Sequence, residues 1–182
     1  MRRNVVTLFA ILVAFAIPAR AATWSIGPSV GFDIYKGSGD ALLVVSAPAG
    51  TDLLFGGVKP GLRLGLRDRT GHQQVFSDMG ITSVTGGGVT LHTTSASLNY
   101  AYAFRSGSSP YVTAGFGFTS FGADGSSESI TTVGFGFGGR NRLRHGHGAI
   151  RVEARYDHAD LPSGIDPVHI VGVRVGFDLD LN

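Results

Sequence analysis

Apolar and polar residues alternate through most of the chain after about residue 22. A period of two places successive side chains on opposite faces of a β-strand. The alternation predicts eight strands, at about residues 24–34, 58–67, 73–84, 89–104, 111–121, 130–143, 150–158 and 171–181. One face of each strand carries mostly Phe, Val, Leu or Ile, and the other carries Gly, small polar or charged residues. No segment combines a helical period with caps, so the pattern favours an all-β domain.

The lengths of the strands and of their connections narrow the fold further. Most predicted strands have about 9–13 residues, and a tilted strand of about 9–11 residues crosses a bilayer. Short Gly-bearing turns are predicted at 68–72, 105–109 and 144–148, and longer loops at 36–56, 122–129 and 159–167. The link at 85–88 departs from this alternation, and residues 41–50 are unusually apolar for a loop. Short turns on one side and longer loops on the other are typical of an outer-membrane barrel.

The first 21 residues have the form of a secretory signal peptide. Arg2 and Arg3 give a basic start, residues 5–17 are mostly apolar, and residues 19–21 have the A-x-A form of a cleavage site. We expect cleavage after Ala21, which leaves residues 22–182 as one barrel domain. Cleavage would leave 12 of the 15 Lys and Arg residues against 13 Asp and Glu, so the charge gives no reason to expect nucleic acid as a partner. The chain has no cysteine, which excludes disulfides and thiolate chemistry.

The period alone does not decide which face of the sheet meets water. A soluble, lipocalin-like barrel in the periplasm would bind a ligand with the same apolar face turned inward. The export signal and the alternation of Gly with Arg favour a membrane barrel instead. Glycine weakens a solvent-facing strand, whereas inside a narrow barrel it leaves room for long side chains. The predicted fold class is therefore an all-β, eight-stranded antiparallel up-and-down transmembrane β-barrel, with the soluble barrel as the alternative.

The polar face then supplies the filling of the barrel, and we expect no open pore. Charges enclosed in the interior should be paired, because an unpaired buried charge is costly. The predicted lumen ionic network consists of Lys59, Arg63, Arg67, Arg140, Arg142, Arg151, Glu153, Arg155, Asp157, Arg174 and Asp178. The candidates for an aromatic girdle at the membrane interfaces are Trp24, Tyr100, Tyr102, Phe104, Tyr111 and Tyr156.

Roughly the last 85 residues resemble the small outer-membrane β-barrel family that includes the OmpA membrane domain and OmpX. The segments that carry the resemblance are SLNYAYAF, PYVTAGFGF, TTVGFGFGGRNRL, AIRVEARYDH and HIVGVRVGFDLDL. The resemblance implies that the final strand carries a signal for the barrel-assembly machinery, with Arg174, Gly176, Leu179 and Leu181 at its positions. The family usually ends on an aromatic residue, whereas this chain ends with Leu181 and Asn182.

The resulting functional expectation is a non-enzymatic protein of the cell outer membrane. Its partners would be outer-membrane lipids, lipopolysaccharide and the assembly machinery, and its role would be structural or one of surface contact. Barrels of this shape serve many functions, so the sequence names no surface ligand. No cofactor is expected, because the Gly134-x-Gly136-x-x-Gly139 stretch resembles a dinucleotide fingerprint but opens no helix.

Two groups of residues raise alternatives to this expectation, a metal site and a hydrolytic active site. His145 and His147 should lie at the opposite end of the barrel from His158 and His169, which argues against one metal site. An outer-membrane lipid A or phospholipid hydrolase is the enzymatic alternative. Lipid A deacylases carry His-x-Ser near the end of the penultimate strand, where this chain has His158-Ala159-Asp160, with Ser163 farther on. The pattern therefore lacks the activated hydroxyl that acyl transfer needs.

Overall fold

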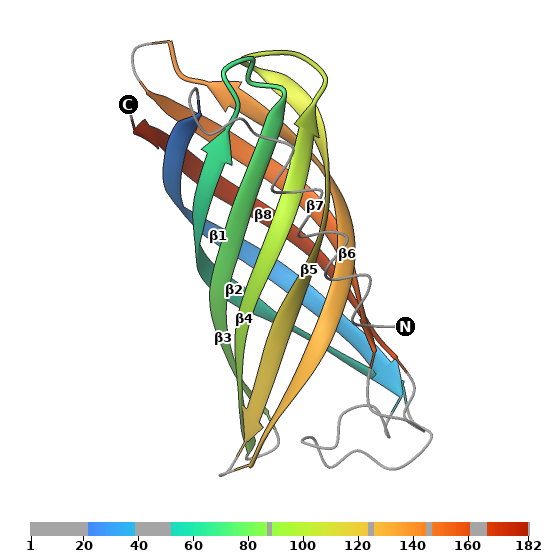
Figure 1. The fold of residues 1–182 in the computed structure, drawn as a ribbon. Helices are drawn as coiled ribbons and strands as arrows, with labels where there is room; N and C mark the ends of the chain where they lie inside the picture. Colours follow the sequence, from blue (N-terminus) through green and yellow to red (C-terminus); the bar gives the residue numbers. More distant parts are fainter. Residues whose placement is uncertain are drawn as a thin grey trace.

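The computed structural model describes residues 22–38, 52–86, 89–123, 126–144, 147–160 and 167–181. They form β1 (Thr23–Ser38), β2 (Asp52–Arg67), β3 (Gln73–Gly86), β4 (Val89–Ala103), β5 (Ser109–Ala123), β6 (Ser126–Arg142), β7 (Gly148–Asp160) and β8 (Val168–Leu181). Each strand pairs antiparallel with the next, and the tilted strands form one wall (Figure 1). Within these ranges no helix has the length and apolar character needed to cross a membrane.

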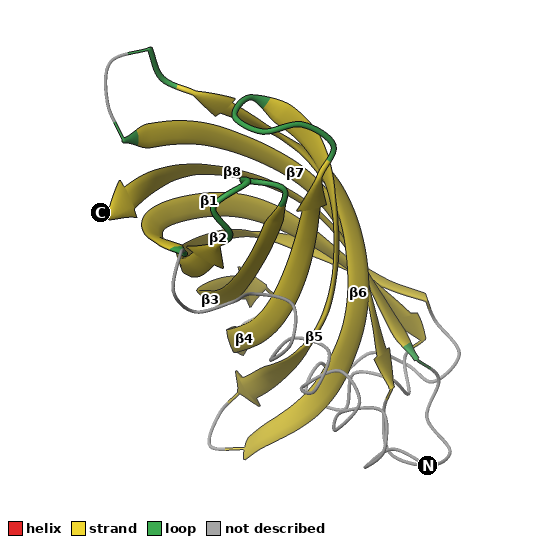
Figure 2. Ribbon diagram, turned by 45° about the horizontal axis from the view of Figure 1, so that its top comes forward, coloured by secondary structure: helices red, strands yellow, loops and turns green. Residues whose placement is uncertain are grey.

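The sheet closes on itself through the first and last strands. β1 pairs with β8 from Trp24 opposite Leu181 to Lys36 opposite His169, while its other edge pairs with β2. Figure 2 shows the resulting ring of strands. Closure gives every strand a partner on both sides, which a hydrocarbon environment requires because it offers no water to backbone groups. The predicted eight-stranded antiparallel barrel is confirmed.

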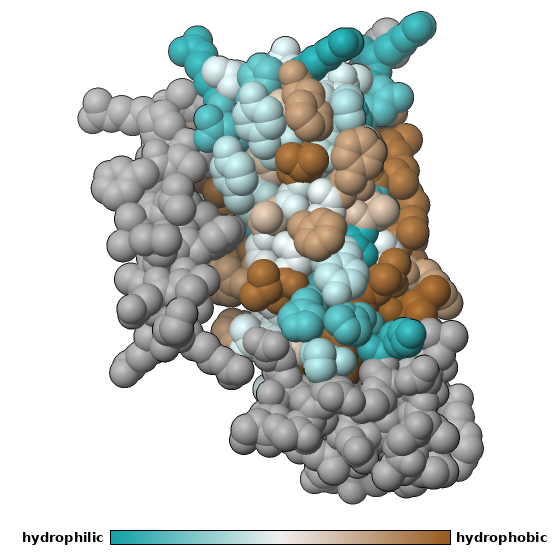
Figure 3. Space-filling view, turned by 90° about the vertical axis from the view of Figure 1, so that its right-hand side faces the viewer, coloured by the Kyte–Doolittle hydropathy of each residue, from teal (hydrophilic) through white to brown (hydrophobic). Residues whose placement is uncertain are grey.

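The wall is apolar on its outer face and polar on its inner face, the reverse of a soluble barrel. Large apolar side chains point outward, with Phe135 63% and Val133 62% exposed, whereas Glu153 inside is 0% exposed. Figure 3 shows apolar side chains over the middle of the wall and hydrophilic ones at its upper end, where the short turns lie. An apolar belt around a polar interior is the arrangement that suits a lipid bilayer outside.

The strands extend farther than the apolar alternation predicts, and one predicted loop is wrong. Residues 122–129 were expected to form a longer loop, but Gly122 pairs with Ser127 and Ala123 pairs with Ser126. Only residues 124–125 separate β5 from β6, just as 87–88 separate β3 from β4. The prediction failed because strand ends beyond the apolar belt keep their backbone pairing without apolar side chains. The first connection shortens to 39–51, and the apolar stretch 41–50 lies outside the described residues.

The opposite end of the barrel has the short turns that the sequence predicts. Residues 68–72, 104–108 and 143–147 connect the strands there. Gly71 and Gly107 adopt positive φ of 77° and 84°, a region that side chains with a Cβ disfavour. The Asp68 carboxylate accepts a hydrogen bond from the Gln73 backbone N–H at 3.1 Å, which holds the first turn closed. We call this end of the barrel the turn end and the other the loop end.

Several aromatic side chains lie on the outside near the turn end, where an interfacial girdle was expected. Trp24 is 61%, Tyr102 43% and Phe104 53% exposed, and Tyr102 and Phe104 meet edge to face. Tyr156, toward the loop end of β7, packs against Phe135 and donates to or accepts from the His169 ring nitrogen Nδ1 at 2.6 Å. Amphipathic rings in these positions suit the membrane–water boundary.

A charge on the outward face should weaken insertion according to its depth. Phe135→Arg, near the middle of β6, should lower the free energy of unfolding of the barrel in lipid vesicles by about 2–4 kcal/mol. Leu143→Arg, on an exposed residue of the third turn, should lower it by only about 0–1 kcal/mol. Urea titration of both variants in the same vesicles measures the difference. Equal effects at the two positions would contradict the placement of the apolar belt.

Candidate functional site

The candidate site is the polar interior, where the barrel gathers almost all of the predicted ionic residues. Three members of the predicted set have side chains that are at most 13% exposed, namely Lys59, Arg140 and Arg174. The buried members are Arg63, Arg67, Arg151, Glu153, Arg155, Asp157 and Asp178. Arg142 differs, because its side chain is 50% exposed at the end of β6. The structure therefore places Arg142 on the rim, reaching inward, rather than within the lumen.

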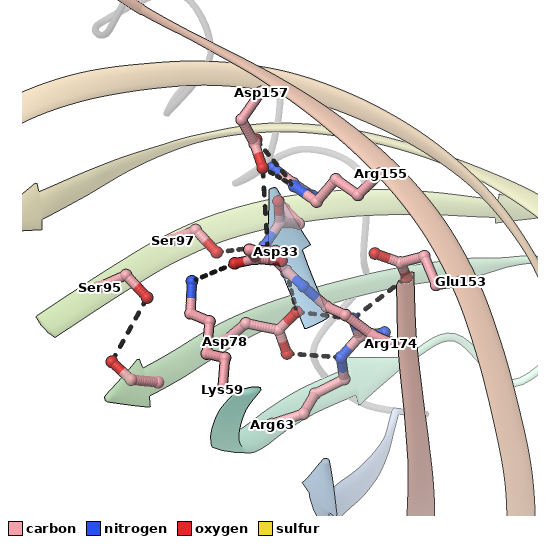
Figure 4. Close-up of polar contacts among 12 residues, drawn as sticks. Asp33, Lys59, Arg63, Asp78, Ser95, Ser97, Glu153, Arg155, Asp157 and Arg174 are labelled. Carbon is pink, nitrogen blue, oxygen red and sulfur yellow. Dashed lines mark hydrogen bonds and ion pairs between the residues drawn. The ribbon is translucent and has the colours of Figure 1, made fainter. Parts of the chain in front are cut away.

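Eight charged side chains in the interior form a group that we call the central cluster. It contains the cations Lys59, Arg63, Arg155 and Arg174 and the anions Asp33, Asp78, Glu153 and Asp157 (Figure 4). Four formal positive charges face four negative ones, so the cluster is neutral as a whole. Its members come from β1, β2, β3, β7 and β8, and their ion pairs therefore connect walls of the barrel that the backbone ladder does not join.

Arg63 is the most completely enclosed cation of the central cluster. Its guanidinium donates to both carboxylate oxygens of Asp78 at 2.6 Å, from the directly opposite position on β3. A further bond of 3.2 Å reaches Glu153 across the lumen on β7. The guanidinium carbon also lies 3.5 Å from the centre of the Phe76 ring. A planar guanidinium suits this combination of a bidentate carboxylate and an aromatic face better than an ammonium does.

Arg174 and Lys59 join the remaining carboxylates of the central cluster. Arg174 lies 3.5 Å from Asp78, 3.9 Å from Asp157 and 4.0 Å from Asp33. Lys59 donates to Asp33 at 3.1 Å. Arg155 donates to both oxygens of Asp157, two residues along the same strand, at 2.8 and 2.9 Å. Each buried charge thus has an opposite charge within reach, as the cost of an isolated one demands.

Tyr111 belongs to this interior and not to the aromatic girdle. It is 5% exposed, packs with Phe76 and Ala101, and donates from its hydroxyl to Glu153 at 2.9 Å. The prediction was wrong because it weighed the position of Tyr111 near a strand end above its parity. Tyr111 precedes Thr113 by two residues, and Thr113 stands on the inward face of β5.

A second group of charges, the turn-end cluster, lies between the central cluster and the short turns. Asp180 accepts from Arg67 at 3.1 Å, from Arg140 at 3.2 Å and from Arg142 at 3.4 Å. Asp178 pairs with Arg151 at 3.3 Å and lies 3.7 Å from Arg140. Four arginines therefore share two carboxylates, which leaves this end of the lumen positively charged. Arg142, on the rim, is the member with most access to water.

Several interior residues were absent from the predicted network. They are the cluster members Asp33, Asp78 and Asp180, and Tyr111, which donates to Glu153. Asp33 and Asp180 stand on the polar face of clearly alternating strands, so the parity of their positions would have found them. Asp78 lies in β3, where the alternation is weak. Its direct opposition to Arg63 follows from the strand register, which the sequence pattern did not determine.

Glycines flank the long interior side chains of β7. Arg155 lies opposite Gly136 on β6 and Gly172 on β8, so both of its neighbours lack a side chain. Glu153 lies opposite Gly138, and a Cβ added there would meet the Tyr111 ring at 2.5 Å. The Gly-Phe alternation of β6 therefore reflects a volume constraint. Its Phe side chains point outward, and its glycines leave space inside for the charged side chains. These glycines stand in the middle of a strand and form no phosphate-binding loop.

One small cavity lies in the part of the interior that the structure describes. A cavity of about 30 Å³ lies beside the central cluster, lined among others by Ser29, Lys59, Ser97, Thr119, Thr132 and Arg155. A cavity of this volume accommodates one or two water molecules and no organic substrate. Such a polar space suits hydration of the enclosed charges.

The described residues offer little support for the alternative chemistries. They contain no group of three or more His, Cys, Asp or Glu side chains placed to hold a metal ion. His158 and His169 lie opposite each other on β7 and β8, with ring centres 5.2 Å apart. The His169 ring stacks with Tyr156, and both histidines stand on the outward parity of their strands and not in the lumen. His145 and Ser163 lie outside the described residues.

Comparisons with known proteins agree with this architecture. A family model described as an outer membrane protein beta-barrel domain matches residues 7–178. No curated protein matches the chain by sequence. The match begins within the predicted signal peptide, which lies outside the described residues and stays a prediction.

Solved structures of similar shape are outer-membrane or surface proteins. Neisserial surface protein A superposes with a TM-score of 0.71 at 13% identity, covering 89% of this chain and 100% of its own. Ail of Yersinia pestis, in complex with the heparin analogue sucrose octasulfate, gives 0.56 at 14% identity, covering 88% and 99%. A major outer membrane protein of Thermus thermophilus gives 0.56 at 15% identity, covering 89% and 100%. At these identities the likeness extends to the fold alone.

Adjacent glycines in β6 provide a test of the volume constraint. Gly138→Ala would push a methyl group against the Tyr111 ring and the Val152 carbonyl oxygen, both within 2.6 Å. We expect a loss of about 1–3 kcal/mol in the free energy of unfolding. Gly139→Ala, on the outward face with nothing within 4 Å, should be neutral or stabilise by up to about 1 kcal/mol. Urea unfolding in one detergent compares them, and a harmless Gly138→Ala would refute the constraint.

Proposed function

The chain belongs to the outer membrane protein beta-barrel domain family, and we propose that it acts there as a non-enzymatic, non-conducting structural barrel whose loop end makes contacts at the cell surface. The family places the protein in the outer membrane. The finer role is supported by one observation above the others, the ion-paired filling of the lumen. We propose that this filling makes the barrel a rigid support and not a channel.

Three properties of the interior support a sealed and inert barrel. The central cluster joins walls that do not pair with each other, through the Arg63–Glu153 contact of 3.2 Å and the Arg174–Asp78 contact of 3.5 Å. The cavity beside it has about 30 Å³, too little for a substrate. The interior charges are engaged with one another, which leaves no isolated pair of acid and base facing a pocket among the described residues. Electrostatic locking is therefore the role that best fits these side chains.

The loop end differs in charge from a surface suited to polyanions. We propose that short turns face the periplasm and the loop end faces outward, as is usual for such barrels. The sequence of the loop-end connections and strand ends contains Lys36 against Asp40, Asp52, Asp124, Glu128, Asp160 and Asp166. Ail was solved with a heparin analogue. The acidic loop end of this chain favours a cationic or metal-bridged partner over that class of ligand, and contact with lipopolysaccharide would need bridging divalent cations.

The final strand is proposed to carry the signal for the barrel-assembly machinery. Leu179 and Leu181 both point outward, at 43% and 48% exposure, and so remain available along the edge of β8 before closure. Arg174 and Gly176 point inward, where Gly176 leaves room for the Arg151 guanidinium. The strand therefore carries recognition residues on one face and packing residues on the other.

Planar-bilayer recording tests the sealed interior. The purified barrel should produce no stepwise conductance, because the central cluster bridges the lumen. Arg63→Ser combined with Asp78→Ser removes the bidentate pair and should produce small conductance steps if the variant remains folded. Heat-modifiable migration on gels checks the folding of both proteins. Regular conductance steps from the unaltered protein would overturn the proposal.

Leu181 and Leu143 provide a matched pair for the assembly signal. Both are exposed leucines at the turn end, at 48% and 44%, but only Leu181 belongs to the proposed signal. Leu181→Ala should reduce the folded fraction in the outer membrane severalfold, whereas Leu143→Ala should not. Leu181→Phe should raise the folded fraction, because the family usually ends on an aromatic residue. The heat-modifiable fraction of isolated outer membranes measures all three, and equal effects of the two alanine variants would exclude this role.

A further inference from the structure

The three short turns carry a ring of exposed arginines. Arg69 lies in the first turn, Arg105 in the second, and Arg142 and Arg144 at the third. All four residues are exposed, and Figure 3 shows hydrophilic side chains gathered at this end of the wall. Within the described part of the chain, Arg69, Arg105 and Arg144 have no carboxylate within ion-pair distance. Their charges therefore remain available to a partner.

The carboxylates at the turn end are already engaged. Asp180 is shared by three arginines, and Asp178 is enclosed between Arg140 and Arg151. Asp68 accepts hydrogen bonds from Thr70 and from the Gln73 backbone within its own turn. Among the described turn residues, Asp68 is the one carboxylate beside these guanidinium groups, and the surplus positive charge of the turn-end cluster lies beneath them.

Apolar side chains place these arginines at a defined depth. Phe104, 53% exposed, directly precedes Arg105, and Leu143, 44% exposed, stands between Arg142 and Arg144. Trp24 and Tyr102 are exposed at the same end of the barrel. Arg105 and Arg144 therefore each directly follow a side chain suited to hydrocarbon, whereas Arg69 stands three residues after Leu66, which pairs with Trp24. That depth is the level of lipid headgroups, where arginines extend their charge toward phosphate.

We propose that this rim, defined by Arg69, Arg105, Arg144, Trp24, Tyr102, Phe104 and Leu143, binds the phosphate headgroups of anionic phospholipids in the adjacent leaflet. Guanidinium groups bind phosphate oxygens in a bidentate manner, and the neighbouring rings and Leu143 contact the acyl chains. The acidic loop end shows that the arginines are a property of one end and not of the whole surface. The proposal depends on membrane embedding, which the family establishes, and not on the role of the loop end.

The single tryptophan makes this preference measurable. Trp24 is the only Trp of the chain, and it faces outward beside Leu66 at the end of β2, which leads into the Arg69 turn. The mature protein is reconstituted into vesicles that mix phosphatidylglycerol with phosphatidylcholine, with brominated chains on one lipid or the other. Quenching of Trp24 fluorescence then reports which lipid occupies the rim. Because the mixed vesicles are symmetric, the direction of insertion does not affect the result.

We expect phosphatidylglycerol to be preferred at Trp24 by about fivefold, the effect of one arginine near an anionic surface. The preference should approach one at about 0.5 M NaCl, because the Debye length then falls to a few ångströms. Arg69→Gln should abolish most of it and Arg69→Lys should retain most of it. Millimolar inorganic phosphate should leave it unchanged, since the rim is assigned to a lipid surface and not to the free ion.

A relocated tryptophan provides the control for position. In a Trp24→Phe, Phe104→Trp protein the fluorophore lies beside Arg105. Arg105→Gln should lower the preference there, whereas Arg69→Gln should have much less effect. Equal quenching by the two lipids in the unaltered protein would overturn the proposal. So would a preference that survives neutralisation of the adjacent arginine, or one that free phosphate removes; heat-modifiable migration confirms folding in every case.

Discussion

The guanidinium group of Arg63 has to be neutralised inside a wall that hydrocarbon surrounds. Its side chain is 1% exposed, and it is met by Asp78 and the Phe76 ring from β3 and by Glu153 from β7. Breaking a buried pair by removing one partner commonly costs about 3–5 kcal/mol, whereas replacing all partners by apolar groups can be neutral. The cluster therefore contributes less to net stability than to the selection of one arrangement. The remaining interior charges follow the same constraint. Each can be enclosed only where the register places a charge of opposite sign on the neighbouring strand or across the lumen.

This selection matters because the apolar pattern alone leaves the register open. A slip of one residue turns a strand inside out, but a slip of two keeps its apolar face outward. Such a slip of β2 against β3 would separate Arg63 from Asp78, which lie directly opposite each other. A slip of β7 would remove Arg155 from its place between Gly136 and Gly172. Ion pairs and glycine positions thus exclude strand registers, shifted by two residues, that the apolar pattern alone would allow.

The same distinction explains what could be predicted from the sequence. Strand number, faces and the interior placement of Arg63, Glu153 and Arg155 follow from parity, because the bilayer imposes one apolar face on every strand. The boundaries at residues 122–129 were missed because pairing continues where the bilayer ends. The partners of Arg174, on β1, β3 and β7, could not be predicted, since contacts across a lumen depend on tilt and closure. Arg142 was misplaced because parity gives the face of a strand but not the depth of a residue.

The uneven distribution of charge between the two ends bears on how such a barrel enters a membrane. If the barrel inserts with its turn end remaining on the side from which it enters, the loop end must cross the hydrocarbon. Arginine keeps its charge at any accessible pH and is more costly than a carboxylate at the bilayer centre. The charged residues of the loop-end sequence are mostly acidic, while Arg69, Arg105 and Arg144 stand in turns that need never cross. The charges that do lie at membrane depth are enclosed with their partners. Apart from Lys36, the charged groups named above are therefore either paired in the interior, left on the near side, or carboxylates, which cross at lower cost.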